Sequence, residues 1–156
     1  MLTIGAMILL SILILRVNGT FLTTGTTLMD TKFGVLATSI ATSEIEEISG
    51  KAFDNYTASN PTKNLNDLSA NLGPDSGETI STYNDIDDYN GYVKTDSSMP
   101  SAIFKTLCTV CYVSSNNLEQ ASSTKTWFKK ITIQVTSKSM PDTVRVSTVY
   151  SYWVFR

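Results

Sequence analysis

The hydrophobic and polar positions of this chain fall into three regions with different periods. The first is an uncharged run from Met1 to Leu15, MLTIGAMILLSILIL, which only Thr3, Gly5 and Ser11 interrupt. As a helix it would be apolar on every side, so it must be surrounded by lipid or by copies of itself. Its length would be about 22 Å at ~1.5 Å per residue, somewhat short of the ~20 residues that usually cross a bilayer.

This run admits three interpretations: a cleaved signal peptide, a membrane anchor, and a stem that crosses the membrane and then packs in the core of a filament. A signal peptide would carry a basic residue ahead of the run, and none precedes it here. The rest of the chain favours the filament stem. That interpretation assigns the assembly core to Met1, Leu2, Ile4, Met7, Ile8, Leu9, Leu10, Ile12, Leu13, Ile14 and Leu15.

The stretch after Arg16, VNGTFLTTGTTLMD, is a weak place for a helix because glycine and β-branched threonine lower helix propensity. It is either a loop between an anchor and a domain, or a helix that melts locally to extended chain. The second interpretation predicts a non-helical segment within residues 17–28 of an assembled filament, with helix on both sides. The residues expected to melt are Asn18, Gly19, Thr20 and Gly25.

In the second region, residues 30–53, apolar side chains recur at spacings of three and four, which predicts an amphipathic helix. They are Phe33, Leu36, Ala37, Ile40, Ile45, Ile48 and Phe53. Asp30 lies at the start, where a carboxylate caps free N–H groups. Glu44, Glu46 and Glu47 are interpreted as a solvated face of this helix, the alternative being contact with basic groups of a neighbouring subunit.

Residues 54–103 are polar and rich in turns, and they predict a variable region of short helical turns and loops packed over a sheet. Within it, Asn84–Gly91 concentrates oxygen ligands before a turn glycine. This pattern is interpreted as a turn, because Asp and Asn favour turns. The alternative is a calcium site with Asp85, Asp87, Asp88 and Asn90 as ligands, although the spacing fails the EF-hand pattern.

From Phe104 the period changes to two, which predicts strands. Cys108, Val110 and Tyr112 share one face of the first run. The second alternates about Trp127, Lys129, Ile131, Ile133 and Val135, and the third about Val144, Val146, Thr148, Tyr150 and Tyr152. The last two runs predict an antiparallel hairpin around a turn at 137–142, in a sheet of at least three strands.

Aromatic residues lie on both faces of these strands: Trp127, Phe128, Trp153 and Phe155. Either all of them fill one core against the amphipathic helix, or some face a neighbouring subunit. Cys108 and Cys111 form a C-x-x-C, but residues three apart in a regular strand point to opposite faces. We therefore expect free, mostly buried thiols, the alternative being a disulfide across a bulged strand.

Together these regions predict an α+β fold, with a long N-terminal helix, hydrophobic and then amphipathic, packed on a C-terminal antiparallel sheet. The stem and its join occupy residues 1–29 and the globular domain residues 30–156, with the helix at 30–53, the loop region at 54–103 and the sheet at 104–156.

The composition narrows the function classes. The net charge of −2 gives no electrostatic case for nucleic acid. The absence of histidine excludes a serine triad and the common histidine-containing zinc sites. No nucleophile is paired with a base, so we expect no catalytic residue, no small-molecule substrate and no cofactor apart from the calcium alternative.

The order of parts resembles type IV pilins and the related pseudopilins. The stretches that carry the resemblance are MLTIGAMILLSILIL, IATSEIEEISGKAFDN and FKKITIQVTSKSMPDTVRVSTVYSYW, and it covers the whole chain as an architecture. One position departs from the family, which usually has Glu at the fifth mature position where this chain has Gly5. In the family that Glu is thought to pair with a neighbour's N-terminal amine during assembly.

The resemblance implies a structural subunit, stored in the cytoplasmic (inner) membrane and then polymerised with copies of itself into an extracellular pilus-like filament, or fimbrium. It leaves N-terminal methylation open. Two alternatives remain from the sequence: a pseudopilin or minor pilin of a secretion system, and a membrane-anchored extracytoplasmic binding domain. Length and composition do not separate these three functions.

Overall fold

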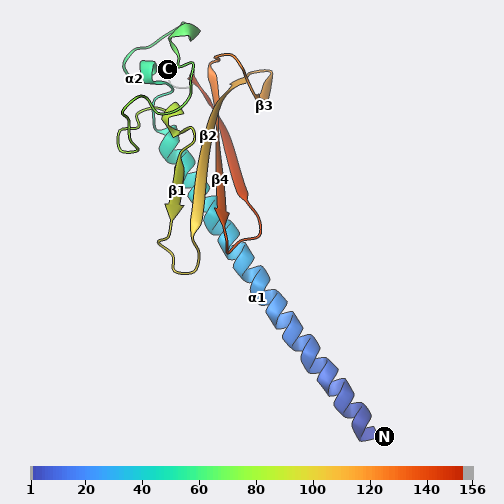
Figure 1. Cartoon of the computed structure of the whole chain (residues 1–156). Helices are drawn as coiled ribbons and strands as arrows, with labels where there is room; N and C mark the ends of the chain where they lie inside the picture. The colour runs from blue at the N-terminus through green and yellow to red at the C-terminus, as the bar shows by residue number, and fades with distance from the viewer. Residues whose placement is uncertain (1, 153–156) are drawn as a thin grey trace.

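The computed structural model describes residues 2–152, with Leu2 described by its backbone alone, and it has an α+β fold (Figure 1). One long helix, α1 (Leu2–Ser49), runs the length of the molecule, and the rest of the chain gathers around its C-terminal half. The smaller elements are α2 (Asn55–Ser59), the 3₁₀ turns η1 (Leu65–Asp67) and η2 (Asp87–Tyr89), and the strands β1 (Val93–Asp96), β2 (Phe104–Ser114), β3 (Asn117–Ala121), β4 (Phe128–Ser137) and β5 (Val144–Ser151).

The sheet is antiparallel in the order β1-β2-β4-β5, with β3 added to the end of β2. The helix α1 packs on β4 and β5. Alternation along β2 and β4 directs one face of each strand at the helix, as the sequence predicted. The core between them is made of buried apolar side chains: Phe33, Ala37, Ala41, Ile48, Phe104, Cys108, Val110, Ile131, Ile133 and Val135.

The helix ends at Ser49, so the predicted end at Phe53 is wrong. Gly50 follows, and the hydroxyl of Tyr150 donates to the Ser49 carbonyl at 2.6 Å. This bond from β5 satisfies one of the carbonyls that a helix end leaves free. The chain turns after this end, and the Phe53 side chain packs in a second buried cluster with Leu68, Tyr112 and Tyr152.

Two short strands lie where the sequence predicted only loop. β1 pairs with β2 inside the predicted loop region, and β3 forms a hairpin with β2 between the first and second predicted strand runs. Their side chains are almost all exposed, so neither strand carries the apolar alternation on which the prediction depended.

The interpretation of the three glutamates as one solvated face is wrong for Glu44. Its side chain is buried and forms an ion pair with Lys94 of β1, whereas Glu46 and Glu47 are exposed. The lysine comes from the strand that the sequence did not predict, so the partner of Glu44 was not visible in the helical pattern. The basic group that contacts Glu44 therefore belongs to this chain, whereas the alternative interpretation placed it on a neighbouring subunit.

Both cysteines are free, which confirms the expectation from strand geometry. Cys108 is buried in the core, and Cys111 is half-buried on the opposite face of β2. Burial raises the pKa of the Cys108 thiol to about 12, so this thiol is protonated and unreactive at neutral pH.

Trp127 packs on the second cluster, stacked on Tyr152 with 5.3 Å between ring centroids. We expect Trp127→Ala to lower the free energy of unfolding of residues 30–156 by about 1–3 kcal/mol, because the indole is only partly buried. Urea unfolding measures the change. Tyr56→Ala, at an exposed aromatic, is the matched control and should stay within about 0.5 kcal/mol. Unchanged stability of this domain, together with weaker filaments of the full chain that carries Trp127→Ala, would instead make Trp127 an interface residue. Trp153 and Phe155 lie outside the described residues.

Candidate functional site

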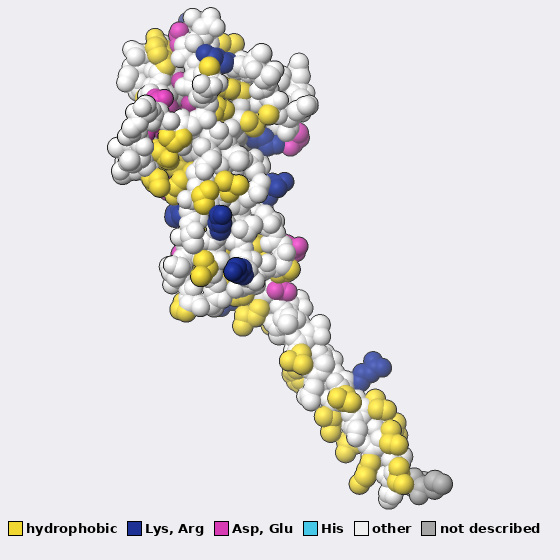
Figure 2. All heavy atoms as spheres, viewed as in Figure 1, with side chains coloured by type: hydrophobic (Ala, Val, Ile, Leu, Met, Phe, Trp, Pro, Cys, Tyr) yellow, Lys and Arg dark blue, Asp and Glu magenta, His cyan; other side chains and the backbone are white. Residues whose placement is uncertain are grey.

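The first candidate site is the free stem, which we define as residues 3–32 of α1. Every side chain in it is exposed, including large apolar ones such as Met7, Leu9 and Leu15, each about 70% exposed. Figure 2 shows hydrophobic side chains along the half of the helix that projects away from the domain. By length and composition, α1 also qualifies as a membrane-spanning helix.

The expected assembly-core residues from Ile4 to Leu15 are all exposed on this stem. Met1 lies outside the described residues, and of Leu2 only the backbone is described. Among the described side chains of the helix, Phe33 is the first that is buried. The stem therefore contributes nothing to the core of its own domain, and its apolar surface is free to contact something else.

Several hydroxyl groups of the stem are satisfied by its own backbone. Ser11, Thr20, Thr23, Thr27 and Thr31 each donate to the backbone carbonyl four residues earlier, at 2.8–3.0 Å. A hydroxyl bonded in this way does not need water, so the threonine-rich join can enter an apolar environment.

The join between stem and domain, where the sequence predicts melting within residues 17–28, is helical in this single chain. Asn18, Gly19, Thr20 and Gly25 all lie within α1. The expected melting concerns the assembled filament, so it stays a prediction.

The second candidate site is a buried ionic cluster, the Lys129 cluster, made of Lys129, Asp54, Asp85 and Asp87. The Lys129 side chain is fully buried, and its Nζ lies 2.6 Å from Asp87 Oδ1 and 3.0 Å from Asp54 Oδ2. It also donates to the Phe53 carbonyl at 2.6 Å. The same amine lies 4.6 Å from the centroid of the Phe53 ring and 5.4 Å from that of Tyr112, so aromatic faces complete its surroundings.

Local backbone structure brings these groups together. Asp54 caps α2 just after the turn that ends α1. Residues 84–86 pair with Ala52 through two backbone hydrogen bonds, which places η2 beside that turn. Lys129 arrives from β4, on the face that also presents Ile131 and Ile133 to the core.

One carboxylate oxygen of each aspartate in the Asp-rich segment accepts from protein donors. Asp85 Oδ1 accepts from the N–H groups of Asp87 and Asp88, and Asp88 Oδ2 accepts from those of Asn84 and Asp85. Asn90 bonds to Leu72 and Val110. Among the described residues, no group of three acidic or cysteine side chains has the arrangement of a metal site. The segment behaves as a turn that packs against Lys129, which favours the turn interpretation over the calcium alternative.

Burial raises the pKa of Asp85 from 3.8 to about 8, and the neighbouring Asp87 and Asp88 add to the effect against the opposing charge of Lys129. The folded state therefore keeps a proton that the unfolded chain loses near pH 4. The contribution of Asp85 to the free energy of unfolding should fall as the pH rises from about 4 to about 8 and stay constant above that.

We expect Asp85→Asn to remove this component of the pH dependence, which is at most about 1.4 kcal/mol per pH unit. An asparagine keeps the Oδ1 acceptor for the two backbone N–H groups. Urea unfolding of wild type and variant across this pH range measures the difference in slope. The exposed Asp142→Asn is the matched control and should leave the slope unchanged. Equal slopes in wild type and Asp85→Asn would contradict the expectation.

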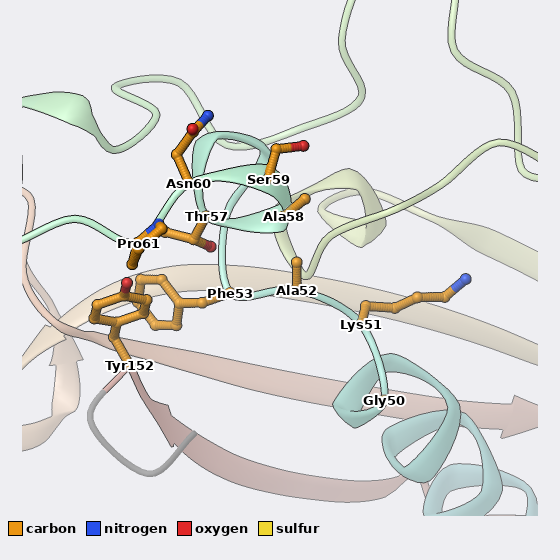
Figure 3. A pocket seen from close by; sticks show the side chains of 10 residues that line it. All are labelled: Gly50, Lys51, Ala52, Phe53, Thr57, Ala58, Ser59, Asn60, Pro61 and Tyr152. Carbon is orange, nitrogen blue, oxygen red and sulfur yellow. The ribbon is translucent and has the colours of Figure 1, made fainter. Parts of the chain in front are cut away.

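An open pocket of about 420 Å³ lies beside this region, lined by the turn after α1, by α2 and by Tyr152 (Figure 3). The rings of Phe53 and Tyr152 form its floor, and the Lys51 side chain extends away from it toward the Tyr83 carbonyl, to which it donates at 2.9 Å. The lining holds no carboxylate or thiol, so it brings together no acid–base pair.

Comparisons with protein-family models, with curated proteins and with solved structures find no match to this chain. The shape itself, a long apolar N-terminal helix on an antiparallel sheet, is compatible with a pilin-like fold.

Sequence reasoning missed the Lys129 cluster, although one signal was present. Lys129 falls in the same alternation as Ile131, Ile133 and Val135, and a lysine on a buried strand face requires a buried anionic partner. The partners, Asp54 and Asp87, lie 75 and 42 residues away in the sequence, so no local pattern links them.

Proposed function

We propose that this chain is the structural subunit of an extracellular, type IV pilus-like helical filament. The subunit would be stored in the cytoplasmic membrane through α1 and then assembled with copies of itself by packing of the free stems. The observation that supports this proposal is a stem exposed over its whole length and, from the positions of its side chains near the N-terminus, apolar around its whole circumference. A soluble protein does not leave such a surface in water.

The small residues of the stem favour packing between helices over simple anchoring. A methyl group added at Gly5, Gly19 or Gly25 would meet no other part of the chain within 4 Å. The fold of the single subunit therefore gives no reason for glycine at these positions. Glycine lets helix backbones approach closely in apolar surroundings, and close approach is what a bundle of stems requires.

An epitope tag inserted between Ser76 and Gly77, in an exposed turn of the loop region, tests the proposal. Surface filaments from cells that express the tagged chain are sheared off, labelled with gold-conjugated antibody and viewed by negative-stain microscopy. Label along the whole length of the filaments supports the structural subunit. Label only at filament tips would make the chain a minor pilin, and label only in the membrane fraction would make it an anchored domain.

The join gives a further prediction. In a filament the domains pack at an axial spacing that a straight helix need not match, and extended chain gains about 1.8 Å per residue over helix. We expect residues within 17–28 to be non-helical in the assembled state, because Gly19 and Gly25 lower the cost of unwinding. A filament reconstruction measures this directly. An unbroken α-helix through these residues would contradict it.

Gly19→Ala combined with Gly25→Ala is the matched variant for the join. Each change favours helix by about 1 kcal/mol and adds only one methyl group, which meets nothing in the single chain. We expect fewer filaments from this variant, at an unchanged amount of subunit in the membrane.

A further inference from the structure

The Lys129 cluster has the components of a bond-forming site as well as those of an ion pair. A primary amine and a carboxyl group are held together without solvent: both the Lys129 and the Asp87 side chains are at most 4% exposed. The Nζ–Oδ1 distance of 2.6 Å places the amine in direct contact with the Asp87 carboxyl group, and two groups held together in this way react as if in one molecule rather than by encounter. Two further acids, Asp54 and Asp85, adjoin this pair.

We propose that Lys129 and Asp87 condense into an intramolecular amide, an isopeptide bond that ties β4 to the segment around η2. The inference is independent of the proposed function, because it concerns chemistry inside one domain.

The reaction needs no oxidant or co-reactant. Asp54 takes one proton from the Lys129 ammonium, and the neutral amine attacks Cγ of Asp87 while the Asp85 carboxyl protonates an Asp87 oxygen. A second proton passes from nitrogen to Asp85, the Cγ–O bond breaks, and Asp54 returns its proton to the departing oxygen. One N–C bond replaces one C–O bond, and one water leaves with two protons that came from the ammonium. Asp54 and Asp85 end as they began.

The surroundings of Asp85 and Lys129 fit the roles of acid and nucleophile that the reaction assigns to them. Asp85 Oδ1 accepts from the Asp87 backbone N–H at 2.9 Å, which holds the two acids side by side, and burial raises the pKa of Asp85 to about 8, so it is a neutral acid at the site. Burial removes the hydration that keeps an ammonium and a carboxylate apart in water, and the product amide carries no charge. The faces of Phe53 and Tyr112 exclude water from the amine.

Asp87 is the acceptor of the amine because its oxygen lies nearer, 2.6 Å from Nζ against 3.0 Å for Asp54, and because other donors hold both oxygens of Asp54. The Asp54 oxygens accept from the Ser69 backbone N–H and hydroxyl at 2.9 and 3.2 Å, and from the Tyr56 N–H at 3.4 Å. These bonds hold the Asp54 carboxyl group in place, with Oδ2 3.0 Å from the amine, so it is positioned to exchange a proton with Lys129.

Mass spectrometry of the full chain, purified in detergent and digested after lysine and arginine, tests the proposal. An amide at Lys129 blocks cleavage there, so we expect a branched peptide that joins residues 64–94 to residues 126–130 and is lighter by one water than their sum. Fragmentation of that peptide should place the branch at Asp87. Cleavage after Lys129 with no branched peptide would overturn the proposal. A branch to residues 52–63, which contain Asp54, would overturn it as well.

Two variants separate the roles. Lys129→Arg keeps the positive charge without a nucleophilic amine, and it should give only linear peptides. Asp85→Asn keeps the acceptor for backbone N–H groups but has no proton to supply, so the branched fraction should fall at least tenfold. Asp142→Asn, an exposed acid in the turn between β4 and β5, is the matched control and should keep the branched fraction of wild type. A wild-type branched fraction in Asp85→Asn would overturn the role of Asp85.

Discussion

A chain without residues 1–29 is expected to be a soluble, folded monomer, whereas the full chain forms polymers or requires detergent. The deletion removes no buried side chain among the described residues, because the core begins at Phe33. The retained part of α1 packs on β4 and β5, and this packing holds it helical without the stem. Asp30 then lies in the first turn, where its carboxylate stabilises the new helix end.

Sedimentation of the truncated and full chains measures this effect. The truncated chain should sediment as a single monomeric species, and its far-UV circular dichroism and cooperative unfolding should show that the domain is intact. A milder variant, Leu9→Ser with Leu13→Ser, keeps the length of the stem and exposes less apolar surface, so it should assemble more weakly than the full chain. Long polymers of the truncated chain would show that the sheet, and not the stem, drives assembly.

The periodic parts of the fold could be predicted from the sequence. The three-and-four spacing after Asp30 and the alternation along β2, β4 and β5 each reflect one face directed at the core, and the structure has those faces. The apolar run reflects a stretch of helix that is exposed on every side. β1 and β3 could not be predicted in this way, because strands with exposed side chains are held by backbone pairing to β2. The helix end was misplaced because a tertiary bond, from Tyr150 to Ser49, fixes it.

The two candidate sites also differ in how far the sequence could predict them. The stem is a continuous stretch, so composition alone identifies it. The Lys129 cluster is assembled from the turn after α1, from η2 and from β4. Each of its members has an ordinary local interpretation: Asp54 as a cap, Asp87 as a turn residue, Lys129 as one lysine of a pair. Only their meeting in the interior gives them a common role.

The second large effect is expected from Lys129→Met, which should lower the free energy of unfolding of residues 30–156 by about 3–5 kcal/mol. The methionine fills a similar volume, but Asp54 and Asp87 are left buried without their cation. This cost is a large share of the roughly 5–15 kcal/mol that stabilises a typical domain. Where the amide with Asp87 has formed, the variant loses that link as well.

Lys130, the residue after Lys129, provides the matched control. Lys130 pairs with Glu119, whose side chain is 89% exposed, and an exposed pair contributes at most about 1 kcal/mol. Urea unfolding should therefore separate Lys130→Met from Lys129→Met by at least about 2 kcal/mol. Adding Asp87→Asn to Lys129→Met removes one uncompensated charge, so the double variant should be more stable than Lys129→Met alone. Equal effects of the two lysine substitutions, or a further loss in the double variant, would mean that packing around β4, and not the buried charge, sets the role of Lys129.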